Sequence, residues 1–259
     1  MDWKKNKRLL ITGAVVAAFS VFYITWAVTG VNHTVRAFDD AYFETSDRAD
    51  DDTIDLCAVP GYIELIKERA FLSSRVKMAS SDSIGLLINL PDSSIQLLIK
   101  GLPVRSVRIA DYDVSPFFKR VNQEALCSML SSPMTITGMH ATFKKDPVNV
   151  KIAPRDTSEV QVADKPDTTD FEAVFFTLDT DRNVRFFFEQ QEDTIFVDRF
   201  ARFFFDLRDR AGNLWSNLKA MVLFDTPVYT PYVKIWLPKA EAKIIYRAIP
   251  REGLIVLKQ

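Results

Sequence analysis

The chain has 259 residues, of which 47 % are hydrophobic, and its formal net charge is −1. Such an apolar composition supports a packed core, and the near-neutral charge excludes the basic surface that a nucleic-acid partner requires. Only 8 glycines are present, and none of them forms a glycine-rich phosphate-binding loop. The composition therefore favours one large globular domain with an attached segment.

The first predicted element is a membrane anchor. The run from Leu9 to Val31 has no charge, and its 23 residues can cross a bilayer as a helix. Tyr23 and Trp26 lie toward its end, where amphipathic rings settle among headgroups. Basic residues precede the run and acidic residues follow it, namely Lys4, Lys5, Lys7 and Arg8 before, and Asp39, Asp40, Glu44 and Asp47 after.

Because Lys and Arg remain on the cytoplasmic side, this charge pattern predicts a single-pass protein of the inner membrane. Residues 1–8 would be cytoplasmic, and the C-terminal domain would be extracytoplasmic, in the periplasm. A cleaved signal peptide is the alternative. Its apolar core is normally shorter, and Ala27–Gly30 is a poor cleavage site.

Residues 32–83 are expected to form an acidic connector followed by a packing helix. Residues 32–52 are polar and rich in Asp. Over residues 60–78, Pro60 suits a first helical turn, and Ile63, Ile66 and Ala70 follow at helical spacing.

Residues 84–130 are expected to hold three strands and a helix. Runs at 84–90 and 95–100 flank the turn-forming residues 91–94. The third run, 103–109, alternates apolar and charged residues, which predicts one solvated face. A helix is expected over 114–130.

The rest of the chain is expected to add further strands and two helices. A strand is predicted at 134–137, or alternatively at 141–143, and another at 148–152 within a loop. Runs at 171–178 and 184–189 predict a hairpin, with Phe186, Phe187 and Phe188 in the core. A long helix follows over 194–222, and a strand at 233–237, a helix at 240–249 and a strand at 254–257 close the chain.

The stretch from Val233 to Val256 resembles the end of the L,D-transpeptidase (YkuD-like) catalytic domain. In that family a strand with the catalytic cysteine, in a Gly-Cys-Ile-Arg-Leu motif, is followed by a short helix and a terminal strand. Residues 233–237, 240–246 and 253–256 are similar to these three parts, and residues 84–109 are similar to the opening strands. The resemblance implies a single extracytoplasmic α+β, β-rich mixed domain over 84–259, with an insertion at about 165–222.

The sequence departs from the family at the reacting residues. Lys234 stands at the position of the catalytic cysteine, Val233 at the preceding glycine, and no histidine occurs between Ala141 and Gln259. A thiol mechanism needs a thiolate and a base. The resemblance therefore implies a domain without catalytic residues, which binds a ligand through Tyr232, Lys234 and Trp236 at the degenerate motif.

The two cysteines, Cys57 and Cys127, are a candidate disulfide outside the cytoplasm. Two buried free thiols are the alternative. Cys127 and His140 are close enough in sequence to be considered as a nucleophile and base, but nothing marks the third group of a triad, which favours structural roles. The scattered Cys and His lack the spacing of a metal site, so no metal and no cofactor is expected.

These features predict a non-catalytic, membrane-anchored envelope protein. Its partners would be the membrane itself and either cell-wall peptide, as in peptidoglycan, or another envelope protein. One alternative is a structural subunit of a membrane complex. Another is an enzyme of unrecognised class that uses carboxylates or Cys127.

Overall fold

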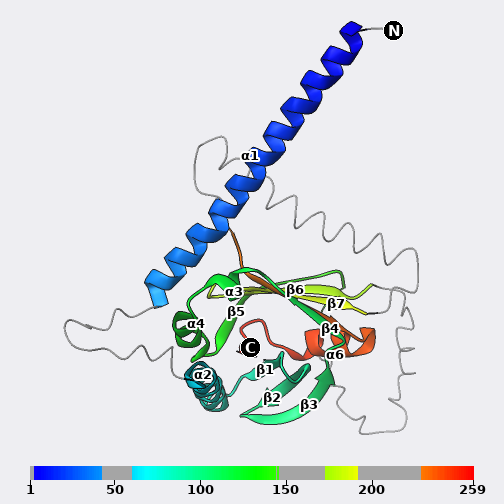
Figure 1. The fold of residues 1–259 in the computed structure, drawn as a ribbon. Coiled ribbons are helices and arrows are strands. Elements are labelled where there is room, and N and C mark those ends of the chain that lie inside the picture. The colour runs from blue at the N-terminus through cyan, green and yellow to red at the C-terminus, as the bar shows by residue number, and fades with distance from the viewer. Residues whose placement is uncertain (1–2, 43–59, 144, 146–172, 192–228) are drawn as a thin grey trace, which may run out of the picture.

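The computed structural model describes residues 3–42, 60–143, 145, 173–191 and 229–259. Within the first helix, the side chains of residues 3–12, 15, 16, 18, 19, 24 and 27 are outside the described part. The predictions of a strand at 148–152 and of a helix at 194–222, and the position of Cys57, also lie outside the described residues. The described residues form a sheet-rich mixed α+β structure (Figure 1).

The strands form one mixed sheet in the order β3-β2-β1-β9-β5-β6-β7-β8-β4. Most neighbours are antiparallel, whereas β1 pairs in parallel with β9 and β7 with β8. The strands are β1 (Ile84–Asn89), β2 (Ser94–Ile99), β3 (Leu102–Arg108), β4 (Asp111–Val114), β5 (Met134–Ala141), β6 (Phe175–Thr180), β7 (Arg185–Gln190), β8 (Tyr232–Leu237) and β9 (Leu254–Lys258).

The sheet folds back on itself, because its two end strands are consecutive in the chain. β3 pairs with β2 and β4 pairs with β8. Between them, Ile109 N–H donates to Ser93 O at 2.8 Å and Ala110 N–H donates to Trp236 O at 2.9 Å. β5 makes the opposite passage, since its first residues pair with β9 and the rest pair with β6. Two layers result, with β1, β2 and β3 in one and β6 and β7 in the other (Figure 1).

The main core fills the space between these layers. Phe176 and Phe188 stack with ring centroids 4.5 Å apart, and Phe186 is fully buried beside them. Tyr246 of α6 (Lys239–Ala248) contacts Phe176 from the side. All three successive Phe residues are at least nine-tenths buried, as predicted, but only Phe186 and Phe188 lie in this core, whereas Phe187 points to the opposite face of β7. Each such side chain stabilises the fold by roughly 1.5–3 kcal/mol.

Helix α2 (Tyr62–Ala79) covers the outer face of β1, β2 and β9. Its Phe71 and Met78 pack on Leu87, Leu98 and Val256 in a second apolar cluster. The helix approaches β1 so closely that a Cβ on Gly85 would lie 2.2 Å from Met78 Sδ. Helix α4 (Gln123–Leu130) lies beside α2.

Helix α1 extends without a break from Trp3 to Tyr42, over 40 residues. The expected connector is therefore wrong for residues 32–42, and its remainder lies outside the described part. Val35 is buried in the core, and the Phe38 ring meets Phe117 edge-on at 5.1 Å. Asp39 Oδ1 accepts a hydrogen bond from Asn122 N–H at 3.0 Å. The apolar side chains at helical spacing outweigh the polar composition, because the domain covers them. In the described part of the chain, no helix is found that is long and apolar enough to cross a membrane.

Two further expectations need correction. The helix expected over 114–130 is two helices, α3 (Phe117–Arg120) and α4, because Val121 and Asn122 adopt extended backbone. Asn122 then caps α4, since its side chain accepts from Glu124 N–H at 2.8 Å. Strand β3 has no covered face beyond Val107, since its other residues are exposed.

The remaining predicted elements are confirmed: α2, the β1–β2 and β6–β7 hairpins, β8, α6 and β9. β5 begins at the first of the two alternatives, Met134, and extends to Ala141.

Candidate functional site

The three residues predicted at the degenerate motif share one face of β8. Along this strand Val233, Ile235 and Leu237 are fully buried in the core. Tyr232, Lys234 and Trp236 alternate with them and are half-buried. Because successive strand side chains point to opposite faces, these three lie together on the outer side of the sheet.

The sheet register extends this face across the neighbouring strands. Phe187 of β7 and Asp113 of β4 flank Lys234, and Glu189 of β7 and Asp111 of β4 flank Trp236. Paired residues of adjacent strands present their side chains to the same face. We call the following set the β8 face: Tyr232, Lys234, Trp236, Phe187, Glu189, Asp111 and Asp113.

Burial decreases across this face from β7 to β4. Phe187 and Glu189 are buried, Lys234 and Trp236 are half-buried, and Asp111 and Asp113 are exposed. A ligand would therefore reach the face from the β4 side, where two carboxylates and the Trp236 ring meet solvent.

Lys234 forms an ion pair within the sheet. Its Nζ lies 3.2 Å from Glu189 Oε1, and the two side chains are only 21 % and 4 % exposed. The same ammonium lies 5.6 Å from the centre of the Phe187 ring, within range of a cation–π interaction. Lys234 is therefore one partner of a largely buried charge pair.

His140, the histidine that the sheet carries, is on a different strand from Lys234. Its row of paired residues runs His140, Thr177, Phe187 and Lys234 across β5, β6, β7 and β8. At about 4.8 Å per strand, this separates His140 from Lys234 by roughly 14 Å. His140 Nε2 instead lies 3.9 Å from Asp179 Oδ2, whose other oxygen pairs with Arg185 Nε at 2.5 Å. His140 is thus too far from Lys234 to act as a base on the β8 face.

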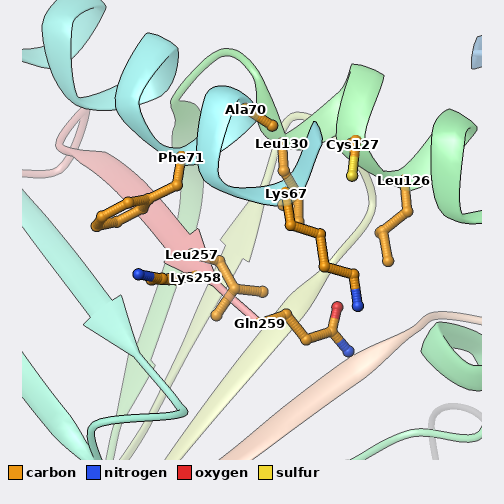
Figure 2. A pocket seen from close by; sticks show the side chains of 9 residues that line it. All are labelled: Lys67, Ala70, Phe71, Leu126, Cys127, Leu130, Leu257, Lys258 and Gln259. Atoms are coloured by element: carbon orange, nitrogen blue, oxygen red, sulfur yellow. The ribbon is translucent and has the colours of Figure 1, made fainter. Parts of the chain in front are cut away.

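Cys127 lies on α4 as a buried free thiol. It lines a small cavity with Lys67, Phe71 and Lys258 (Figure 2). Burial raises the pKa of the Cys127 thiol, and the charge of Lys67 only partly opposes this. A neutral, buried thiol is a poor nucleophile. Cys57 is outside the described residues, so the disulfide between these cysteines stays a prediction.

Among the described residues, no group of three or more His, Cys, Asp or Glu side chains could hold a metal ion.

The sequence named the β8 residues of the site but missed their neighbours. Glu189, Phe187, Asp111 and Asp113 come from other strands, and strand order cannot be read from spacing. One signal was present: Glu189 directly follows three Phe residues in a strand expected to be buried. A carboxylate there requires a partner, and the structure supplies Lys234.

No protein-family model, no curated protein and no solved structure matches this chain.

Proposed function

We propose that this protein is a membrane-anchored envelope protein that binds an amine-bearing cell-wall peptide at the β8 face. The domain over 84–259 would be a degenerate L,D-transpeptidase-like domain that recognises its ligand without reacting with it. The observation that carries this proposal is the largely buried Lys234–Glu189 ion pair, because the sequence resemblance aligns Lys234 with the family's nucleophile.

The anchor is supported by the sequence of α1. An uncharged run of 23 residues is about 35 Å long as a helix, against about 30 Å of hydrocarbon. Many of its apolar side chains, Leu9, Leu10, Val15 and Val16 among them, lie outside the described part. The flanking charges support a cytoplasmic N-terminus and a periplasmic domain.

The chemistry of the β8 face favours a cationic group. Glu189 already neutralises Lys234, whereas Asp111 and Asp113 form no ion pair with a described residue. The half-buried Trp236 lies opposite Asp111 in the register. Two carboxylates beside an indole ring attract an ammonium through charge and cation–π interaction. The diamino acid of a cell-wall peptide presents such an ammonium, as does a Lys of an envelope protein.

The test is co-sedimentation of the full chain, in mild detergent, with purified sacculi. We expect Asp111→Asn/Asp113→Asn to lower the bound fraction about fivefold, because two exposed charge interactions are lost. Trp236→Ala should act in the same direction. Asp82→Asn is the matched control, since Asp82 is an exposed carboxylate on Lys100, away from the β8 face.

The wild-type protein should not co-sediment with sacculi that have been stripped of their peptides. Equal binding to stripped sacculi, or an unaffected Asp111→Asn/Asp113→Asn variant, contradicts the proposal. Absence of binding at every salt concentration removes the cell wall as the ligand, and crosslinking in native membranes would then identify an envelope protein.

A structural subunit of a membrane complex is the second candidate. The observation that favours it is the continuous passage of α1 into the domain, with Val35 and Phe38 packed on the core. Replacing residues 9–31 by an unrelated anchor should abolish function if the helix assembles with other membrane helices. Under the binding proposal the same replacement leaves sacculus binding intact.

A further inference from the structure

A groove runs between the last turns of α1 and the domain. Its volume is about 220 Å³, and it is lined by Thr34, Ala37 and Ala41 on α1 and by Phe117, Arg182 and Val184 on the domain, with further residues beside them. This is smaller than the roughly 300–1,000 Å³ clefts that hold drug-sized ligands.

Small side chains on the helix create the groove. Thr34, Ala37 and Ala41 recur at helical spacing, and Ala37 and Ala41 remain exposed although they line it. The groove is therefore open along the helix. Its accessible apolar surface lies on α1, at Ala37, Ala41 and the half-buried Phe38, because Phe117 and Val184 on the domain side are almost completely buried.

The charged part of the groove is a cation, beside the uncharged polar side chains of Thr34, Tyr42 and Asn183. Arg182, in the turn between β6 and β7, is half-buried and forms no ion pair with any residue that the structure describes. The neighbouring acid, Asp181, is engaged elsewhere, since its Oδ1 accepts from Thr135 N–H at 3.0 Å. A guanidinium that has no ion-pair partner among the described residues, beside apolar side chains, matches an amphiphile with an anionic head and an apolar chain.

The position of the groove identifies the amphiphile, in a step that rests on the anchor proposed above. Thr34 follows Val31 by three residues, or about 4.5 Å of helix. The headgroup layer is about 5–7 Å thick, so the groove begins within it. A phospholipid of the same bilayer is thus adjacent to the groove.

We infer that the groove between α1 and the domain holds one acyl chain of an anionic phospholipid, with its phosphate against Arg182. The acyl chain moves from the apolar bilayer interior to an apolar groove, so its transfer free energy is small. Covering Ala37, Ala41 and Phe38 removes their exposed apolar surface from water, which favours binding. The guanidinium adds preference for an anionic headgroup.

The test uses the full chain, delipidated in detergent and examined by native mass spectrometry with palmitoyl-oleoyl phosphatidylglycerol or phosphatidylcholine. Wild type should retain one phosphatidylglycerol. Ala41→Phe fills the groove and should weaken retention about tenfold, and Ala37→Leu should weaken it less. Asn32→Phe is the control, because helical spacing places exposed Asn32 away from the groove. Arg182→Gln should lower the ratio of retained phosphatidylglycerol to phosphatidylcholine about fivefold.

Each result has one meaning. Retention by Ala41→Phe that equals wild type, with an unchanged melting temperature, overturns the inference. So does a photocrosslinking amino acid at position 41 that captures a protein rather than lipid in native membranes. Release of the wild-type chain from membranes by sodium carbonate overturns the anchor instead. If the protein stays in carbonate-washed membranes but retains no phospholipid, lipid binding in the groove is refuted and the anchor is not.

Discussion

The outer face of β1, β2 and β9 and the β8 face belong to the same sheet, and they are covered in opposite ways. The first face carries Leu87, Leu98 and Val256, which pack under Phe71 and Met78 of α2 in a cluster of apolar side chains. The β8 face carries an ion pair and, toward its open side, two exposed carboxylates.

The difference separates a structural face from a candidate binding face. Apolar burial stabilises by about 25 cal/mol per Å² and needs no partner chemistry. A buried ion pair loses hydration as it gains attraction, so its net contribution is small compared with a well-packed apolar pair. Stability alone therefore accounts for the α2 side but not for the charges on the β8 face.

The largest expected effect comes from opening the α2 side. Leu87→Ala should lower the free energy of unfolding by about 3 kcal/mol, because it leaves a cavity beneath Phe71 and Met78. Urea denaturation measures this. Leu65→Ala is the control, because Leu65 lies on the opposite side of α2 and is 71 % exposed, and it should change stability by less than about 0.5 kcal/mol. Equal effects of the two variants would show that α2 does not seal this face.

The second effect concerns the ion pair of the β8 face. Lys234→Met should lower the free energy of unfolding by about 2 kcal/mol, since it removes the Lys234 charge from beside the buried carboxylate of Glu189. This is below the range for fully buried pairs because Lys234 is partly exposed.

A double-mutant cycle distinguishes the pair from simple loss of packing. Glu189→Gln/Lys234→Met should recover at least about 1 kcal/mol relative to the sum of the single variants. Lys100→Met is the control, because the Lys100–Asp82 pair is exposed and should contribute less than about 0.5 kcal/mol. Strict additivity in the β8 cycle would mean that the two side chains do not interact.

The elements of both faces were predictable where local pattern alone determines them. The strict alternation of Val233, Ile235 and Leu237 with polar or aromatic neighbours indicates one buried face, and the structure confirms it. The turn residues between β1 and β2 likewise mark a hairpin.

What could not be predicted depends on contacts between distant segments. Glu189 and Lys234 are 45 positions apart, and only the parallel pairing of β7 with β8 brings them together. The helical state of residues 32–42 depends on Val35 and Phe38 reaching the core. No local spacing specifies either contact.

A smaller effect is expected where the β2–β3 turn meets the end of α2. Gly101 has φ of 79°, and a Cβ there would lie 2.7 Å from Ala79 Cβ. Gly101→Ala should lower the free energy of unfolding by about 1–2 kcal/mol, by backbone strain and by displacement of the α2 end. Thermal unfolding measures it.

The control for that variant comes from the same turn. Lys100 also has a positive φ, of 51°, so Lys100→Gly relieves strain and should change stability by no more than about 0.5 kcal/mol. A neutral Gly101→Ala variant would show that the turn moves freely away from α2.

The smallest expected effect is in an exposed ion pair, which sharpens the contrast with Glu189 and Lys234. Arg105 Nη2 and Nε each lie 2.8 Å from a carboxylate oxygen of Glu241. Hydrogen bonding to Arg105 lowers the pKa of the Glu241 carboxyl. Because the folded-state pKa is lowered, the stabilisation is present above the unfolded-state pKa and is lost as pH falls through the folded-state value.

Arg105→Met should return the pKa of Glu241 toward its ordinary value, as followed by carboxyl ¹³C NMR. Salt should reproduce part of this change, since exposed charges are screened, whereas it should leave the Glu189–Lys234 coupling largely intact. Equal salt sensitivity of the two pairs would mean that solvent screens the Glu189–Lys234 pair as strongly as the exposed Arg105–Glu241 pair.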